Sequence, residues 1–288
     1  MNARQRRERL RRLLAGQACV SPASVHDPLS ARLAESAGFE LGLFSGSIAS
    51  AVLLAAPDLI LHTLSELADH VRRILRASTL SLIVDADNGF GNALAVMRTV
   101  EELEHAGVAM LSVEDTVGPA FSSGAPEAEL VSLDEAVGKY RAAVAARSDA
   151  TLAIAARTRV LTAEGIDRAI VRVKAYAAAG VDVIWTPRID SLEEVKAIRE
   201  AAGLPVVVGS KHGNFSRDEL AECGVRIALQ GHMPIAAAIK AMRDTYVHLA
   251  DPSKQPRPAL ASGAEMDRLL DGDAFQQRLE AYLRAPRT

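Results

Sequence analysis

The sequence predicts an α/β fold, a closed (β/α)8 barrel of the TIM type that carries a C-terminal helix swapped between subunits. Eight short apolar runs recur along the 288 residues, and most of them precede a helical pattern. The runs are largely apolar rather than alternating, which is typical of strands buried on both faces. The length also suits a barrel, which usually needs ~250 residues. A doubly wound open sheet is the alternative, but no GxGxxG motif follows the first run and no P-loop is present.

The apolar runs and helical patterns alternate, which favours a parallel sheet. The expected strands are residues 17–21, 40–44, 81–86, 110–114, 152–156, 182–186, 205–209 and 226–230. The expected helices between them are residues 62–77, 93–106, 133–146, 163–179 and 192–202. Gly107, Gly180 and Gly203 follow three of these helices, where a left-handed residue commonly ends a helix. Ser132 is an expected N-cap, with Glu135 placed to complete a capping box.

The N-terminal segment is rich in arginine, with six arginines within residues 4–12. We interpret it as an amphipathic first helix with Leu10, Leu13 and Leu14 on its buried side. A mitochondrial presequence is the alternative, because such peptides are amphipathic and rich in arginine. Glu8 interrupts the basic run and a strand follows almost at once, so we expect a cytoplasmic protein.

The C-terminal segment differs from the rest of the chain. We expect the barrel to occupy residues 1–250 and a tether with a helical segment to occupy residues 251–288. Three prolines within residues 251–258 predict an extended tether. A helical pattern with an apolar stripe follows over residues 264–283, and Gly272 is placed to break it in two. Because the stripe must be buried, we expect this segment to pack on another subunit of a homo-oligomer.

The composition excludes several classes of protein. Lys and Arg total 33 against 36 Asp and Glu, so the net charge of −3 gives no sign of a nucleic-acid partner. The apolar runs are too short to span a membrane. Cys19 and Cys223 lie far apart and form no CxxC pattern, so we expect neither a disulfide scaffold nor a thiolate metal site.

Acidic residues follow two neighbouring strands. Asp85 and Asp87 come at the end of the third expected strand, and Glu114 ends the fourth. In a barrel these strand ends meet at the face that carries the active site, where clustered carboxylates repel one another unless a cation lies among them. Oxygen ligands select Mg²⁺, with Mn²⁺ as the alternative ion. The competing interpretation is that Asp-Asn-Gly is only a turn, but Glu114 on the neighbouring strand favours a metal.

Other strands end in groups that suit an anion. Ser45, Gly46 and Ser47 follow the second strand, where small residues let backbone N–H groups approach an anion; an ordinary Ser N-cap is the alternative. Arg157 suits a carboxylate through its planar fork, or else forms an ion pair with the acidic residues after the fourth strand. His232 follows the last strand and either contacts substrate or is structural. A metal, an anion cradle and an arginine together indicate a small dicarboxylate or α-oxo acid.

Several segments together resemble the isocitrate lyase/phosphoenolpyruvate mutase superfamily. They are DPLSARLAESAGFE at residues 27–40, Ser-Gly-Ser at 45–47, Ala-Pro-Asp at 56–58, Asp-Ala-Asp-Asn-Gly-Phe-Gly at 85–91, Val-Glu-Asp at 113–115 and Ala-Arg-Thr at 156–158. Their order and spacing fit from about residue 21 to residue 240. The resemblance implies a (β/α)8 barrel that binds Mg²⁺ and an α-oxo acid or its enolate. It also implies a homotetramer, a dimer of dimers with a swapped C-terminal helix.

The resemblance also assigns roles to individual residues. Asp85 would be the direct Mg²⁺ ligand. Asp58, Asp87 and Glu114 would hold the waters of the metal. The substrate-binding residues would be Ser45, Gly46, Ser47, Arg157, Asn214 and His232, and the catalytic residues would be His232 and Arg157.

The loop after the fourth strand distinguishes the branches of the superfamily. Residues 116–124 contain none of the Cys, Lys or His of the isocitrate-cleaving lyases, and neither the Lys nor the Asn of the mutases. A plain loop and the Gly231-His232 pair resemble the oxaloacetate decarboxylase branch. Two features depart from that branch. Arg159 stands where an acidic or amide residue is common, and Lys211-His212 stand where Thr-Tyr is frequent.

The expected function follows from that branch. We expect a carbon–carbon lyase, a Mg²⁺-dependent decarboxylase of oxaloacetate or a related 3-carboxy-2-oxo acid that acts through a metal-stabilised enolate. The alternatives are a phosphoenolpyruvate phosphonomutase-type enzyme, a carbon–carbon lyase for another α-oxo or 2-hydroxy acid, and a non-catalytic binder of a small dicarboxylate. Decarboxylation needs no acid–base residue on the loop, in agreement with residues 116–124.

Overall fold

The computed structural model describes residues 1–118 and 129–283, with Lys211 described by its backbone alone, and it contains an eight-stranded parallel sheet. The strands are β1 (Ala23–Ser24), β2 (Leu41–Phe44), β3 (Ser81–Asp85), β4 (Met110–Glu114), β5 (Ala153–Arg157), β6 (Val183–Arg188), β7 (Val206–Lys211) and β8 (Val225–Ala228). Each strand pairs with the next one in sequence. Val20, just before β1, forms a parallel bridge with Ile227 of β8, so the sheet closes into the predicted barrel.

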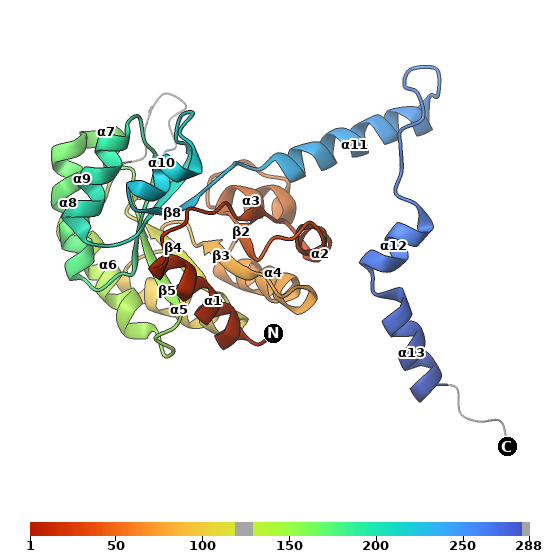
Figure 1. Cartoon of the computed structure of the whole chain (residues 1–288), viewed down its shortest axis with the longest axis horizontal. Helices are drawn as coiled ribbons and strands as arrows, with labels where there is room; N and C mark the ends of the chain where they lie inside the picture. Colours follow the sequence, from red (N-terminus) through yellow and green to blue (C-terminus); the bar gives the residue numbers. More distant parts are fainter. Residues whose placement is uncertain (119–128, 284–288) are drawn as a thin grey trace. The chain divides into compact units, whose positions relative to one another are not determined.

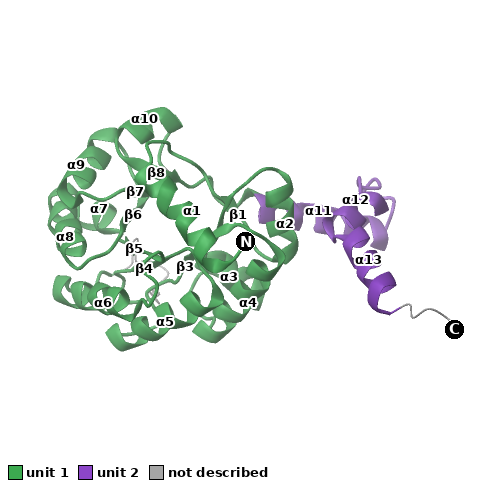
Figure 2. Ribbon diagram, turned by 60° about the horizontal axis from the view of Figure 1, so that its bottom comes forward, with its two compact units in different colours: residues 1–233 green, residues 234–288 purple. Residues whose placement is uncertain are grey.

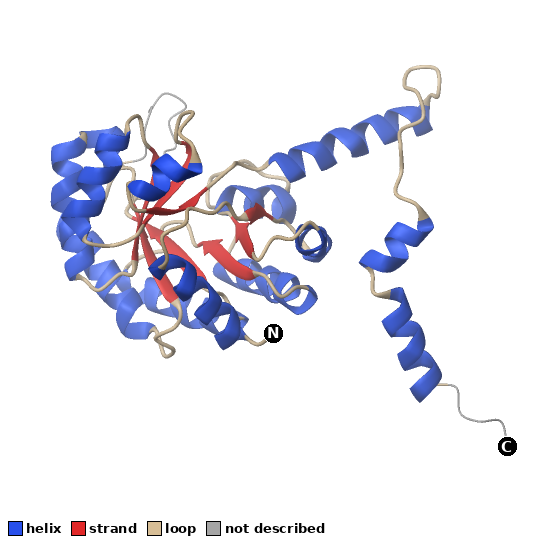
Figure 3. Cartoon of the chain, viewed as in Figure 1, coloured by secondary structure: helices blue, strands red, loops and turns tan. Residues whose placement is uncertain are grey.

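The helices surround this sheet (Figure 1, Figure 3). They are α1 (Ala3–Ala15), α2 (Pro28–Ser36), α3 (Gly46–Leu54), α4 (Leu64–Ala77), α5 (Ala93–Ala106), α6 (Leu133–Ala146), α7 (Val160–Glu164), α8 (Ile166–Ala178), α9 (Leu192–Ala202) and α10 (Arg217–Glu222). The bounds predicted for α5, α6 and α9 are confirmed. The helix predicted over residues 163–179 is wrong at its start, because Gly165 adopts a φ of 82° and separates α7 from α8.

The first strand also differs from its prediction. It was expected at residues 17–21, but it forms at Ala23–Ser24, and only the Val20 bridge lies within the expected range. Pro22 explains the interruption, because it has no N–H group to donate to the ladder between Val20 and Ala23.

The core lies inside the barrel. Side chains from strands at opposite sides of the barrel form one buried cluster, among them Leu43, Ile83, Met110 and Val207. Leu10 and Leu14 of α1 belong to the same cluster, and Leu13 packs against it. The expected buried side of the first helix is therefore confirmed.

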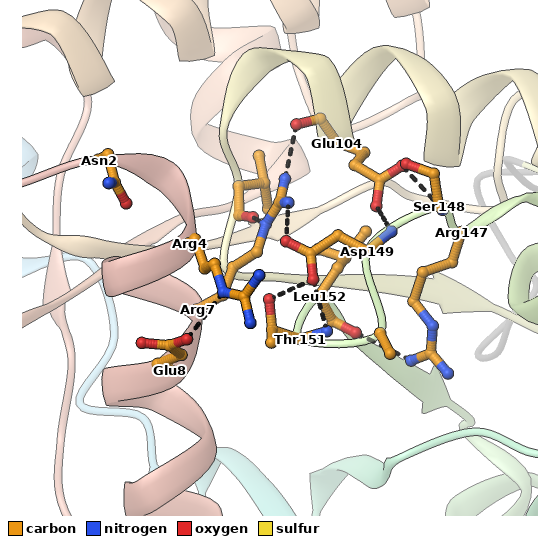
Figure 4. A network of polar contacts seen from close by, with 12 residues as sticks. Asn2, Arg4, Arg7, Glu8, Glu104, Arg147, Ser148, Asp149, Thr151 and Leu152 are labelled. Carbon is orange, nitrogen blue, oxygen red and sulfur yellow. Dashed lines mark hydrogen bonds and ion pairs between the residues drawn. The ribbon is translucent and has the colours of Figure 1, made fainter.

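The arginines of α1 bind the edge of the barrel where the strands begin. Arg7 donates from Nε to the carbonyl of Val108 at 2.9 Å and from a terminal nitrogen to the carbonyl of Glu104 at 2.6 Å. It also pairs with Asp149 at 2.8 Å, whose other oxygen accepts a hydrogen bond from Thr151 (Figure 4). The N-terminal helix thus covers the end of the barrel opposite to the carboxyl ends of the strands.

Other arginines of α1 act in the same way. Arg6 donates to the carbonyls of Leu75 and Ser78, and Arg11 donates to three carbonyls in residues 150–152 and pairs with Asp182. These bonds tie α1 to carbonyl groups between the helices and the strand starts, of which those of Leu75 and Ser78 are buried.

The chain divides into two compact units, Met1–Met233 and Pro234–Thr288 (Figure 2). The second contains most of α11 (Met233–Ala250), followed by α12 (Gly263–Leu269) and α13 (Gly272–Tyr282). The predicted break near Gly272 is confirmed, since Asp271 is left-handed with a φ of 56°. A turn at Asp251 interrupts the segment that was predicted to be extended.

Two expectations about this second unit stay predictions: the boundary at residue 250 and the swap of the C-terminal helix between subunits.

Along the described ranges, no helix has both the length and the apolar composition of a membrane-spanning segment.

We expect Arg7→Met to lower the free energy of unfolding by about 2–4 kcal/mol, because it removes one partner of a partly buried ion pair and a side-chain donor of the buried carbonyls of Val108 and Glu104. Urea unfolding followed by circular dichroism measures the change. Arg4→Met is the matched control: Arg4 lies on the same helix, is exposed, and within the described ranges pairs only with Glu8, so its unfolding midpoint should stay unchanged. Equal stability of the two variants would contradict the proposed role of Arg7.

Candidate active site

A cavity of about 440 Å³ opens at the carboxyl ends of the strands. Nearly all of the polar residues predicted from the sequence line it, together with Trp185 and Arg159. The predicted residues at the cavity are Ser45, Ser47, Asp58, Asp85, Asp87, Glu114, Arg157 and His232. Because this is the face on which barrel enzymes build their sites, the cavity is the candidate active site.

Arg157 is the central cation of the cavity. The register of β4 and β5 places Glu114 directly beside Arg157, whereas Asp85 at the end of β3 is paired with Ser112, two residues before Glu114. Nη1 of Arg157 lies 2.5 Å from Oδ2 of Asp85 and 3.2 Å from Oε2 of Glu114. Its guanidinium also lies over the ring of Trp185, 5.6 Å from the centroid. Burial opposes the charge of Arg157, but Asp85 and Glu114 raise its pKa nonetheless.

The ion pair that was the alternative interpretation of Arg157 is therefore confirmed for Glu114, and Asp85 joins it. Asp115, by contrast, donates its backbone N–H to the carbonyl of Arg157 at 3.2 Å, and its carboxylate is not among the ion-pair partners of Arg157 in the described residues. It is buried and accepts hydrogen bonds from Thr158 at 2.7 Å and Tyr176 at 2.6 Å, with Arg172 at 3.3 Å. Asp115 thus fixes the outer side of β4 against α8, whereas Glu114 faces the cavity.

Asp87 is held in a turn that begins where β3 ends. It adopts a left-handed φ of 48°, Gly89 follows with a φ of 79°, and the N–H of Gly89 donates to the carbonyl of Ala86 at 2.8 Å. The predicted turn chemistry is thus present as well as the carboxylate cluster. Burial, and then the charges of Asp85 and Asp58, raise the pKa of Asp87 to about 8.

Gly46 has a role that the sequence pattern did not indicate. It does not line the cavity, although we expected it to bind substrate. A Cβ atom at this position would lie 2.0 Å from Oδ1 of Asp87. Gly46 therefore makes room for the Asp87 carboxylate, and its lack of a side chain is required for that reason.

His62 is the site residue that sequence reasoning missed. It is buried beside the turn of residues 85–91, with Nε2 3.3 Å from Oδ2 of Asp87, Nδ1 3.3 Å from the hydroxyl of Ser50, and its ring edge-on to Phe90. Burial lowers the pKa of His62. The sequence around His62 shows only a polar residue just before a helix. It does not indicate the contact with Asp87, because Asp87 lies far along the chain.

His232 lies between two serine hydroxyls. Nδ1 is 2.8 Å from Oγ of Ser24, and Nε2 is 3.2 Å from Oγ of Ser45, which is itself 2.9 Å from Oγ of Ser47. Ser45 also accepts the N–H of Ile48 as the N-cap of α3, so the alternative reading of this serine is confirmed. Burial lowers the pKa of His232, which makes the neutral ring the prevailing form at pH 7.

Some predicted features lie elsewhere. Asn214 is exposed in the turn after β7 and does not line the cavity, because that turn faces solvent. Ser122 and Ser123 of the branch-deciding loop lie outside the described residues, while Thr116 and Gly118 line the cavity.

The oxygen donors of the cavity fit a hard divalent cation. Asp58, Asp85, Asp87 and Glu114 all line it, and the buried Oδ2 of Asp87, although 3.3 Å from Nε2 of His62, accepts no hydrogen bond from the described residues. Among residues 1–118 and 129–283, no three His, Cys, Asp or Glu side chains are grouped closely enough to hold a metal ion. Any such ion would therefore depend largely on water for its coordination, as Mg²⁺ commonly does.

Comparison with known proteins points to one family. The model of the phosphoenolpyruvate phosphomutase family matches residues 10–250. An oxaloacetate decarboxylase from Bradyrhizobium diazoefficiens is 50% identical over 252 residues, which cover 87% of each chain. An oxaloacetate decarboxylase from Rhodopseudomonas palustris is 46% identical over 98% of this chain and 99% of its own length.

Solved structures agree with these relatives. A phosphonopyruvate hydrolase in complex with oxalate and Mg²⁺ superposes with a TM-score of 0.83 at 30% identity, covering 99% of this chain and all of that one. The sequence relatives and the solved structures therefore agree on the family and on the fold of the barrel.

We expect Gly46→Ala to weaken Mg²⁺ binding about tenfold and to cost about 1–3 kcal/mol of stability, because the new methyl group must displace Asp87. Calorimetric titration with Mg²⁺ and urea unfolding measure the two effects. Gly138→Ala in α6 is the matched control, since a Cβ there meets no atom within 4 Å; it should leave Mg²⁺ binding unchanged and stabilise the helix by about 0.5–1 kcal/mol. Unaltered Mg²⁺ binding in Gly46→Ala would contradict the role of this glycine.

Proposed function

The chain belongs to the phosphoenolpyruvate phosphomutase family, and on that premise we propose that it is a divalent-metal-dependent decarboxylase of oxaloacetate or a related 3-carboxy-2-oxo acid. It acts as a carbon–carbon lyase. The observation that carries the proposal is the 46% identity to an oxaloacetate decarboxylase over nearly the full length of both chains. The cavity supports it, because its carboxylates and arginines suit a metal and an anionic oxo acid.

The reaction requires little of the protein beyond a cavity of suitable charge and shape. The C3–C4 bond of oxaloacetate breaks, CO2 leaves, and the electron pair of the bond becomes an enolate with its charge on the C2 oxygen. A proton then adds to C3 and gives pyruvate. A bound divalent cation, Mg²⁺ in our proposal with Mn²⁺ as the alternative, supplies the Lewis acidity that stabilises the enolate oxygen.

The acidic residues of the cavity would hold this ion. Asp85 is the proposed direct ligand, and Asp58, Asp87 and Glu114 are the proposed partners of its waters. Arg157 keeps Asp85 and Glu114 side by side, and its buried Nε has no hydrogen-bond partner among the described residues. We assign that face of the guanidinium, with Ser47, to the substrate carboxylate and the oxo group.

His232 would orient the oxo group or the departing carboxylate and assist protonation of the enolate. Ser24 and Ser45 contact its two nitrogens and fix the plane of the ring. Because burial favours the neutral imidazole, His232 adds no competing positive charge at the departing carboxylate. A neutral ring with one N–H group can donate to the oxygen and pass a proton onward.

The alternative reactions of the family demand more of the loop after β4. Cleavage of a 2-hydroxy acid needs an acid–base pair that closes over the substrate, and phosphonyl transfer needs cationic or amide donors. Residues 116–130 contain no Lys, Arg, His, Cys or Asn. Decarboxylation is the reaction that this composition suits.

Assembly and location complete the proposal. Met266, Leu270, Phe275 and Leu279 of the C-terminal helical segment are exposed apolar side chains. We propose that they are covered in a homotetramer, a dimer of dimers with a swapped C-terminal helix, that works in the cytoplasm.

With Mg²⁺, the purified protein should release CO2 and pyruvate from oxaloacetate well above the rate of Mg²⁺ alone. It should have little activity on 2-methylisocitrate and none on phosphonopyruvate. Asp85→Asn should lose roughly a hundredfold or more of kcat/KM and still fold, because the amide keeps the size of the carboxylate and loses its charge.

Asp69→Asn is the control for this variant, because Asp69 lies on the surface of α4 and its one ion pair in the described part of the chain is with Arg72. It should keep wild-type activity. Interconversion of phosphonopyruvate and phosphoenolpyruvate would overturn the proposal in favour of a mutase, and activity that persists with EDTA would remove the metal from it.

A further inference from the structure

Arg159 is a second arginine of the cavity that the proposed reaction does not use. It follows β5 two residues after Arg157 and lines the cavity, yet its side chain is 39% exposed. Its Nε binds Oε1 of Glu114. The two terminal nitrogens make no hydrogen bond or ion pair with any residue in the described ranges.

The contact with Glu114 does not by itself explain Arg159. Oε2 of Glu114 is already paired with Arg157, which is much less exposed, at 14%, and is packed over Trp185. Glu114 therefore has a buried cationic partner without Arg159. Glu114 instead anchors the Nε side of Arg159. This contact leaves the N–H groups of the two terminal nitrogens side by side at the cavity. Those groups form the fork that binds a carboxylate through two hydrogen bonds.

We propose that Arg159 is a specificity-determining residue that binds an anionic group at the end of the substrate remote from the 2-oxo acid. This inference rests on the proposed function and deepens it. The substrate class would be 3-carboxy-2-oxo acids whose C3 substituent itself ends in a carboxylate. The cavity of about 440 Å³ lies in the size range of pockets for ligands larger than oxaloacetate.

The departing carboxylate is a poor partner for Arg159 on energetic grounds. A carboxylate that leaves as neutral CO2 loses its charge in the transition state. A guanidinium bound to it would stabilise the ground state more than the transition state and so slow the reaction. A carboxylate that keeps its charge throughout the reaction gains binding from Arg159 without that penalty.

Two product-like inhibitors test the proposal. 2-Oxoglutarate and 2-oxopentanoate share the 2-oxo acid end and chain length, and they differ only by a terminal carboxylate in place of a methyl group. In the presence of Mg²⁺ the wild-type protein should bind 2-oxoglutarate about tenfold more tightly, measured by calorimetry. Arg159→Met should abolish this preference, and Arg159→Lys should retain part of it because it keeps the charge and loses the fork.

Oxalate separates this role from an effect through Glu114. Oxalate has no remote group, so its Mg²⁺-dependent affinity should change less than twofold in Arg159→Met. Arg188→Met is the matched control, because Arg188 is an exposed arginine that ends the neighbouring strand β6 and pairs with Asp190; it should leave all three affinities unchanged.

Equal binding of the two oxo acids by the wild type, or equal weakening of all three ligands in Arg159→Met, would overturn the inference. Its failure is distinct from failure of the proposed function. The inhibitor preference is measured by binding alone, whereas the proposed function fails when oxaloacetate is not decarboxylated.

Discussion

The site depends on one interaction, the contact of Arg157 with Asp85 and Glu114. Parallel strands bring β3, β4 and β5 side by side, and the register places Glu114 opposite Arg157. Four carboxylates then line one cavity, and such a cluster raises the free energy of the fold unless cations lie among them. Arg157 and Arg159 are the cations that the chain supplies there. Burial, and then the charges of Asp85 and Asp58, raise the pKa of Asp87, so a divalent ion in the cavity would favour the ionised form of this carboxyl group.

The two ends of the barrel have opposite tasks. At the end where strands begin, the arginines of α1 satisfy backbone carbonyls and lock the helix onto the barrel. At the other end, arginines meet carboxylates instead, as the pairs of Arg157 with Asp85 and of Arg159 with Glu114 illustrate. The two ends of the barrel thus use arginine side chains for different partners, backbone carbonyls at one end and carboxylates at the other.

Much of this could be predicted from local patterns. Strand β4 was predicted with its observed bounds, because Met110–Glu114 is an apolar run that ends in an acidic pair. Most of the polar residues that ring the cavity could be predicted because they end a strand or follow one closely, whereas Asp58 follows α3 and was indicated only by the family resemblance. The start of β1 could not be predicted from apolarity, since the missing N–H of Pro22 decides it. The contacts of His62 and Gly46 with Asp87 could not be predicted, because each residue is separated from Asp87 by a long stretch of chain and neither lies in a recognisable motif for this contact. The choice between an ion pair and a substrate contact for Arg157 depended likewise on a distance that no sequence contains.

In the proposed site, the carboxylate cluster and Arg157 bind a metal ion and the 2-oxo acid end of the substrate together. Oxalate tests it most directly, because its two carboxylates mimic the enolate of pyruvate and can chelate one ion. Calorimetric titration of the protein with oxalate, with and without saturating Mg²⁺, measures the coupling. Mg²⁺ is expected to tighten oxalate binding by about a hundredfold or more, at the upper end of typical coupling between ligands. Equal affinity for oxalate in the presence and absence of Mg²⁺ would contradict it.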